Sequence, residues 1–132
     1  RTIAASALRT GTLEIDSEDC ADVIIRHDCG AQSSLHLDYI SRPRRRSLEI
    51  MGTNGFVEID ILGRRLTMTS ENGELIKDQT FSGSNSDTYH SEIVDFCSAI
   101  KENSTPRCSG EDGLAVLHQV LAARQLCGLP QS

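Results

Sequence analysis

The segment Ser41-Arg42-Pro43-Arg44-Arg45-Arg46 has the residue types best suited to recognising a charged ligand. It places four arginines within five residues, and the rigid guanidinium fork binds carboxylate or phosphate through two parallel hydrogen bonds. Because proline fixes its own φ, Pro43 would splay the side chains on either side of it. The alternative is a solvated loop or an edge strand whose charges discourage aggregation. The residues alone leave both interpretations open.

Tyr89 and Glu92 are a second pair with two interpretations, because both fall at the start of a predicted helix. They could contribute to a binding site. In the structural alternative, the tyrosine anchors packing and the first-turn glutamate complements the helix dipole. Neither interpretation is excluded by the sequence around them.

The remaining reactive side chains match no catalytic, cofactor or metal motif. The four histidines are His27, His36, His90 and His118. They lack H-E-x-x-H or i, i+4 spacing, so each is interpreted as a surface or structural histidine and no metal site is predicted. The five cysteines fit neither a disulfide framework nor a CxxC metal knuckle. We therefore expect reduced thiols and a cytoplasmic protein.

Composition limits the class of protein. A chain of 132 residues suits one domain, residues 1–132. With 38% hydrophobic residues, 4% aromatic residues and no tryptophan, its core must be aliphatic. The net charge of −6 argues against nucleic acid and anionic membranes as partners. The opening residues show neither a signal peptide nor an initiator methionine, so we expect a piece of a longer protein.

The elements that would position these residues are strands first and helices last. Apolar and polar residues alternate in six segments: 23–28, 35–39, 48–50, 57–61, 66–69 and 75–81. Gly52-Thr53-Asn54-Gly55, Gly63-Arg64 and Glu71-Asn72-Gly73 are turn sequences, which predict that the last three or four strands form an antiparallel meander.

Helical periodicity then replaces the alternation. Tyr89, Ile93, Phe96 and Ile100 recur at helical spacing within about 87–103. A second helix is predicted from the capping sequence Ser109-Gly110-Glu111-Asp112 to a stop at Gly128. We therefore predict an α+β fold, a predominantly antiparallel open-faced sheet with both helices packed on one face.

Three stretches, in this order, carry a family resemblance. Leu48 to Gly55 is like E-I-x-G-x-x-G, Tyr89-x-x-Glu92-x-x-x-Phe96 is like Y-x-x-E-x-x-x-F, and Pro106 precedes Gly110-Glu111-Asp112-Gly113 and an alanine-rich helix. Over about residues 12 to 127 the chain resembles the C-terminal domain of the Gfo/Idh/MocA family, named for glucose–fructose oxidoreductase, inositol dehydrogenase and a rhizopine-catabolism protein.

The resemblance implies a longer enzyme in which the cofactor is bound by a domain that this chain does not contain. Family members hold NAD or NADP in an N-terminal Rossmann domain, where the lysine of a Glu-Lys-Pro motif helps catalysis. This chain has no Glu-Lys-Pro and no D-x-G-x-H-like run. The implied parent is an NAD(P)-dependent oxidoreductase, whereas this chain alone would be inactive and would bind no cofactor.

The resemblance also implies what this part would bind. The family's open sheet forms a wall of the substrate pocket and a subunit interface, so a sugar-type substrate, the chain's own Rossmann domain and a second copy are the expected partners. Arg42 and Arg44 stand where relatives acting on neutral polyols have tyrosines, which suggests an anionic sugar acid or nucleotide-linked sugar. Tyr89 resembles a tyrosine near the pocket mouth. The alternatives are a non-catalytic dimeric scaffold module and an independent anion-binding domain.

Overall fold

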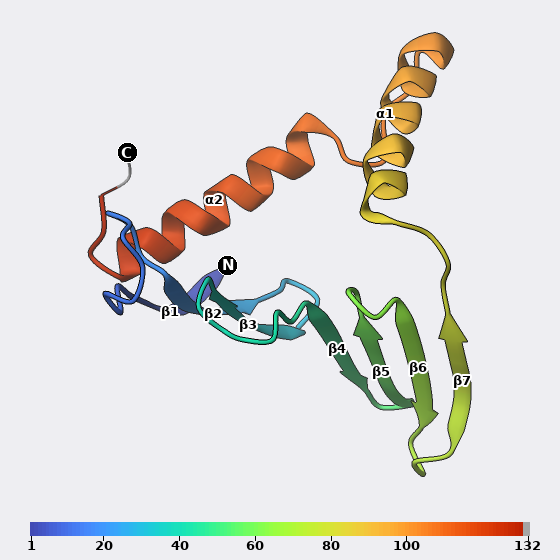
Figure 1. The fold of residues 1–132 in the computed structure, drawn as a ribbon, viewed down its shortest axis with the longest axis horizontal. Helices are drawn as coiled ribbons and strands as arrows, with labels where there is room; N and C mark the ends of the chain where they lie inside the picture. The colour runs from blue at the N-terminus through green and yellow to red at the C-terminus, as the bar shows by residue number, and fades with distance from the viewer. Residues whose placement is uncertain (131–132) are drawn as a thin grey trace. The chain divides into compact units, whose positions relative to one another are not determined.

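The computed structural model describes residues 1–130, which contacts between Cα atoms divide into two compact units. The first unit contains Arg1–Ser41 and the described residues from Ser98 onward, and the second is Arg42–Cys97. Figure 1 shows the elements in chain order. That residues 1–132 act as one domain stays a prediction.

The first unit is a three-stranded antiparallel sheet with a helix on one face. Strands β1 (Thr2–Leu8), β2 (Cys20–Arg26) and β3 (Gln32–Asp38) are arranged in the order β1-β2-β3. Helix α2 (Gly110–Leu126) packs against β1. The register places Ala5, Val23 and Leu35 side by side on one face and Ser6, Asp22 and His36 side by side on the other.

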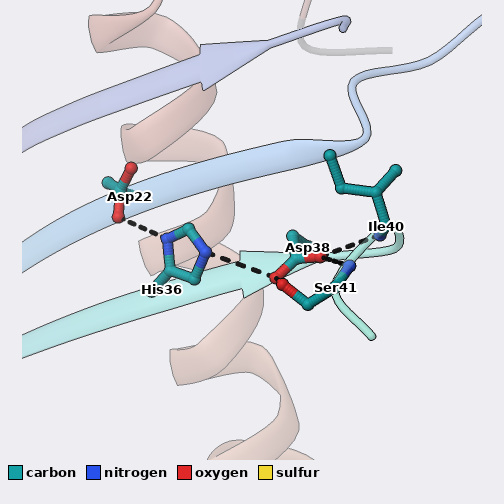
Figure 2. A network of polar contacts seen from close by, with 5 residues as sticks. All are labelled: Asp22, His36, Asp38, Ile40 and Ser41. Carbon is teal, nitrogen blue, oxygen red and sulfur yellow. Dashed lines mark hydrogen bonds and ion pairs between the residues drawn. The ribbon is translucent and has the colours of Figure 1, made fainter. Parts of the chain in front are cut away.

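Polar contacts attach α2 to the first of these faces. The Thr2 hydroxyl donates a 2.8 Å hydrogen bond to the Gln119 side-chain oxygen, and Arg124 Nη1 lies 3.3 Å from Glu18 Oε2. Thr2 pairs with Ile25, whose side chain shares the face of Val23. The helix therefore covers the apolar face, and the face with His36 points away from it (Figure 2).

The start of α2 follows the predicted capping box. Ser109 Oγ accepts a 3.1 Å hydrogen bond from the Asp112 N–H, and the Asp112 carboxylate accepts one of 2.9 Å from the Ser109 N–H. Together these bonds satisfy two N–H groups that the helix cannot pair internally. The prediction from the sequence is confirmed here.

The second unit contains the predicted meander. Strands β4 (Ser47–Gly52), β5 (Gly55–Asp60), β6 (Arg65–Ser70) and β7 (Leu75–Thr80) form an antiparallel sheet in the order β4-β5-β6-β7. Its apolar face contains the cross-strand rows Leu48–Ile59–Leu66 and Ile50–Val57–Met68. Its polar face contains the row Glu49–Glu58–Thr67–Asp78.

Helix α1 (Asn85–Glu102) follows β7 and has a largely exposed apolar stripe. The predicted stripe residues Tyr89, Ile93, Phe96 and Ile100 are between 56% and 70% exposed. No extensive contact joins α1 to the four-stranded sheet within the described residues. Neither helix within residues 1–130 is long and apolar enough to span a bilayer.

The predicted antiparallel α+β class is confirmed, with the strands divided between two sheets instead of one. The division follows the sequence, because residues 41–46 are almost all polar and lack the alternation that a continuing strand would need. A further strand, β1, was not among the six predicted segments.

Candidate functional site

The arginine segment forms an exposed connection that leads into β4. Arg42 and Arg44 are both exposed, as are Arg45 and Arg46, and the Arg42–Pro43 peptide bond is cis. Accessible guanidinium groups are a requirement for ligand recognition, and the predicted binding residues meet it. Their role in binding stays a prediction.

Antiparallel pairing brings further arginines to the same end of the four-stranded sheet. Ser47 at the start of β4 pairs with Asp60, Asp60 pairs with Arg65, and Arg65 pairs with Thr80. The row continues outward through two backbone hydrogen bonds, from the Ile61 N–H to the Arg46 carbonyl at 2.9 Å and from the Phe81 N–H to the Arg64 carbonyl at 2.8 Å. We call this place the arginine-rich end; its members are Arg42, Arg44, Arg45, Arg46, Arg64 and Arg65.

Two of these arginines are balanced by nearby carboxylates. Arg65 donates from Nε and Nη2 to the Asp78 carboxylate at 2.8 and 2.6 Å. This pairing raises the pKa of Arg65 and lowers the pKa of Asp78. Hydrogen bonds from Ser84 lower the pKa of Asp87, and the nearby charge of Arg64 lowers it further.

The remaining charge at this end is concentrated in the segment before β4. Arg44, Arg45 and Arg46 have no ion pair within the part of the chain that the structure describes. Three exposed guanidinium groups that form no ion pair attract anions. The segment therefore suits a carboxylate or phosphate ligand better than a neutral one.

A small pocket lies on the polar face beside this end. Its lining residues are Glu58, Asp60, Arg65 and Thr67. One oxygen of Asp60 accepts a 2.8 Å hydrogen bond from the Gly63 N–H, which fixes that carboxylate at the β5–β6 turn. Carboxylates and a threonine hydroxyl are suitable partners for the hydroxyl groups of a sugar.

Tyr89 lies at the same end of the sheet but beyond its other edge. It is in α1, which follows β7, whereas Arg42 and Arg44 precede β4. Strands β4 and β7 are the two edges of the sheet, separated by three strand spacings or roughly 14 Å. The fold thus places the three predicted residues at one end of the sheet without making Tyr89 a neighbour of the arginines.

A separate polar network lies on the open face of the three-stranded sheet (Figure 2). His36 Nδ1 is 2.8 Å from Asp22 Oδ1, and His36 Nε2 is 3.3 Å from Asp38 Oδ2. Asp38 also accepts hydrogen bonds from the N–H groups of Ile40 and Ser41 and from the Ser41 hydroxyl at 2.7 Å. The histidine is therefore held between two carboxylates.

These contacts shift the pKa values of the network in opposite directions. The hydrogen bonds from Ser41 and Ile40 lower the pKa of Asp38 to about 2. The hydrogen bond and charge of Asp22 raise the pKa of His36. Burial, together with the charges of Asp22 and Asp38, raises the pKa of the Cys20 thiol.

Sequence reasoning did not identify Arg64, Arg65 or the Asp22–His36–Asp38 network as candidates. The signal for the network is the spacing of two residues between Cys20 and Asp22 and between His36 and Asp38, which places each pair on one face of a strand. Only the cross-strand register joins the two pairs.

The strand pairing of the described residues differs from that of a dinucleotide-binding domain. Every strand pair in residues 1–130 is antiparallel, whereas dinucleotides bind at the carboxyl ends of parallel strands in a βαβ unit.

Comparisons with solved structures identify similar folds in larger proteins. Two crystal structures of UDP-N-acetylglucosamine 3-dehydrogenase GnnA from Acidithiobacillus ferrooxidans match with TM-scores of 0.77 and 0.78 at 21% identity. Both alignments cover 96% of this chain and 40% of that protein. An oxidoreductase from Agrobacterium radiobacter, solved with NAD+, L-tartaric acid and magnesium, matches with a TM-score of 0.78 at 23% identity, covering 96% of this chain and 41% of that one.

The chain shares its fold with part of these oxidoreductases. It spans about two fifths of their length. No protein-family model matches the sequence, and no curated protein matches it.

Proposed function

We propose that this chain is the substrate-binding and oligomerisation domain of an NAD(P)-dependent oxidoreductase of the Gfo/Idh/MocA type. The observation that carries the proposal is the structural match over 96% of the chain to 40% of one oxidoreductase and 41% of another. The E-I-x-G-x-x-G-like turn and the Y-x-x-E-x-x-x-F-like helix start support it. We also propose a cytoplasmic location, which agrees with five free cysteines.

In this proposal the cofactor belongs to the rest of the full-length protein. The nicotinamide would exchange a hydride with a carbinol carbon of the substrate. The residues of this chain would bind and orient that substrate, because residues 1–130 form no parallel βαβ unit and the sequence has no Glu-Lys-Pro motif.

The proposed substrate is a sugar derivative that carries an anionic group. Arg42 and Arg44 would pair with that group, while the Glu58 and Asp60 carboxylates of the adjacent pocket would accept hydrogen bonds from sugar hydroxyls. Two of the structural neighbours have anionic compounds in their names, a UDP-linked sugar in one and L-tartaric acid in the other.

Kinetics of the full-length protein test the role of the arginines. Arg42→Ala/Arg44→Ala should raise the KM for a UDP-sugar or a sugar acid by roughly 10- to 100-fold, because charged hydrogen bonds are lost. The KM for a neutral sugar should change little. Arg26→Ala, which removes an exposed arginine of β2, is the matched control. Equal KM values for the double variant and the control would contradict the assignment.

We propose that the apolar face of the four-stranded sheet is the oligomer interface. Leu48 and Ile50 of β4 are 49% and 51% exposed, and they continue the apolar rows of β5 and β6. Exposed contiguous apolar surface of this kind is typical of protein interfaces.

Light scattering on Leu48→Glu tests this interface. The parent protein should have twice its monomer mass, and Leu48→Glu should be monomeric with an unchanged circular dichroism spectrum. Thr80→Glu is the control, because Thr80 is exposed and pairs with Arg65, whose side chain shares the polar face with Thr67. A dimeric Leu48→Glu variant would reject this face. A dimer that binds no NAD(H) as full-length protein would favour the scaffold-module alternative.

A further inference from the structure

We propose that Cys20, Asp22 and His36 form a binding site for a divalent transition-metal ion, with zinc as the ion that fits best. A thiol sulfur, a carboxylate oxygen and an imidazole nitrogen of these residues all lie within 4.8 Å of one another. The residues take no part in the proposed substrate or oligomer contacts, so the inference is independent of the proposed function.

Strand geometry explains why the three ligands meet. Cys20 and Asp22 are two residues apart in β2 and therefore point to the same face. His36 of β3 is the direct cross-strand partner of Asp22. Neighbouring strands are about 4.8 Å apart, so the three side chains converge without any change in the backbone.

The size of the cluster matches a single ion. Zinc lies about 2.0–2.3 Å from its nitrogen, oxygen and sulfur ligands, so ligand atoms around one tetrahedral ion are about 3.5 Å apart. Distances within 4.8 Å reach this value through small side-chain rotations of Cys20, Asp22 and His36. Two of the three residues are exposed, which gives an ion a route in.

The chemistry of the ligands selects the metal. Thiolate and imidazole favour zinc and related transition metals, whereas magnesium and calcium require oxygen ligands. Three protein ligands leave the fourth tetrahedral position for water or an exogenous ligand. The site therefore has the ligand number of an open zinc site.

The structure already contains a carboxylate that can hold the histidine ligand in place, which is the carboxylate of Asp38 beside His36. A metal-bound histidine usually donates its second N–H to a carboxylate, which fixes the orientation of the ring. His36 Nε2 lies 3.3 Å from Asp38 Oδ2, and its Nδ1 is the nitrogen that faces Asp22. Asp38 is itself held by Ile40 and Ser41, and its side chain is only 10% exposed.

Metal binding displaces protons from two positions. The thiol proton of Cys20 is released to solvent, and the proton between His36 Nδ1 and Asp22 Oδ1, 2.8 Å apart, leaves that position; from a neutral imidazole it moves to Nε2, which faces Asp38. The ion then takes over the position between these groups, and its charge replaces the displaced protons. Because the imidazole stays hydrogen-bonded to Asp38, its ring need not turn.

Cobalt spectroscopy of the purified full-length protein tests the site. Co²⁺ should produce a thiolate-to-cobalt charge-transfer absorption that an equivalent of Zn²⁺ abolishes. Cys20→Ser should lose this absorption, while Cys29→Ser should keep it, because Cys29 is exposed and lies outside the cluster. Circular dichroism shows whether both variants remain folded.

Two further variants separate a metal site from a lone reactive thiol. His36→Ala should weaken Zn²⁺ binding at least as much as Asp38→Asn, for which a loss of about 10- to 100-fold is expected for an outer-shell partner. An absorption that persists in Cys20→Ser, a Zn²⁺ affinity unchanged in His36→Ala, or the absence of any cobalt–thiolate absorption in the parent protein would each overturn the proposal.

Discussion

Replacing Gly55 by alanine tests the close approach of the backbone at the start of β5 to the backbone of β6. Gly55 has a φ of +143°, and a Cβ added there would overlap the carbonyl oxygen of Thr69 and lie 3.1 Å from the Thr69 carbonyl carbon. Cβ atoms essentially never approach another atom within 3.0 Å. The obstacle is backbone of β6, so the β5–β6 ladder itself has to move.

The expected cost has two parts. Holding a residue other than glycine in such a backbone conformation costs about 1–3 kcal/mol, and forcing an extra carbon into a packed position costs about 1–3 kcal/mol more. Gly55→Ala should therefore lower the free energy of unfolding by about 2–6 kcal/mol, which is a large part of the 5–15 kcal/mol typical of a domain.

Gly73→Ala provides the matched control. Gly73 also has a positive φ, +81°, but a Cβ added there would meet nothing within 4 Å. Only the backbone term applies, so its expected cost is about 1–2 kcal/mol. Urea unfolding followed by far-ultraviolet circular dichroism measures both variants. A loss at Gly55 no larger than the loss at Gly73 would refute the overlap with Thr69.

Three further predictions concern a helix cap and two titrating groups. Ser109→Ala should lower the free energy of unfolding by about 1 kcal/mol in chemical denaturation; an unchanged value would contradict the capping box. The folded-state pKa of His36 is raised above 6.5. The contribution of His36 to the stability of the folded state is therefore complete below pH 6.5 and is lost as the pH rises through the folded-state pKa. His36→Gln should then destabilise most in acid, and NMR titration that finds no raised pKa would contradict this. The pKa of Asp38 is lowered from 3.8 to about 2. The contribution of its carboxylate to the stability of the folded state is therefore present above pH 3.8 and is lost as the pH falls to 2. Asp38→Asn should destabilise at neutral pH and not at pH 2, and equal effects at both would reject the assignment.

Local sequence signals predicted the parts of the fold that local geometry determines. The Gly52-Thr53-Asn54-Gly55 turn joins β4 to β5, and the Ser109–Asp112 capping box begins α2. Both depend on residues a few positions apart. Strand β1 was missed because its sequence, TIAASAL, is built mainly from small residues whose alternation is weak.

Features that depend on long-range pairing could not be predicted in the same way. Arg64 and Arg65 reach the arginine-rich end only because of the antiparallel strand order. The start of β6 lies beside the end of β5, and the end of β5 lies beside the start of β4. The approach of His36 to Asp22 depends on the β2–β3 register, and a slip of one residue would turn the histidine to the other face.

The order of the two units along the chain has a consequence for synthesis on the ribosome. Residues 42–97 are continuous, and their sheet is made of successive hairpins, so it can form as soon as they emerge. The other unit must wait for its last segment, because the hydroxyl of Thr2 is bonded to Gln119, 117 positions later. Until α2 has been made, the apolar side of β1, β2 and β3 has no helix to cover it, and its exposed surface is open to aggregation for that interval.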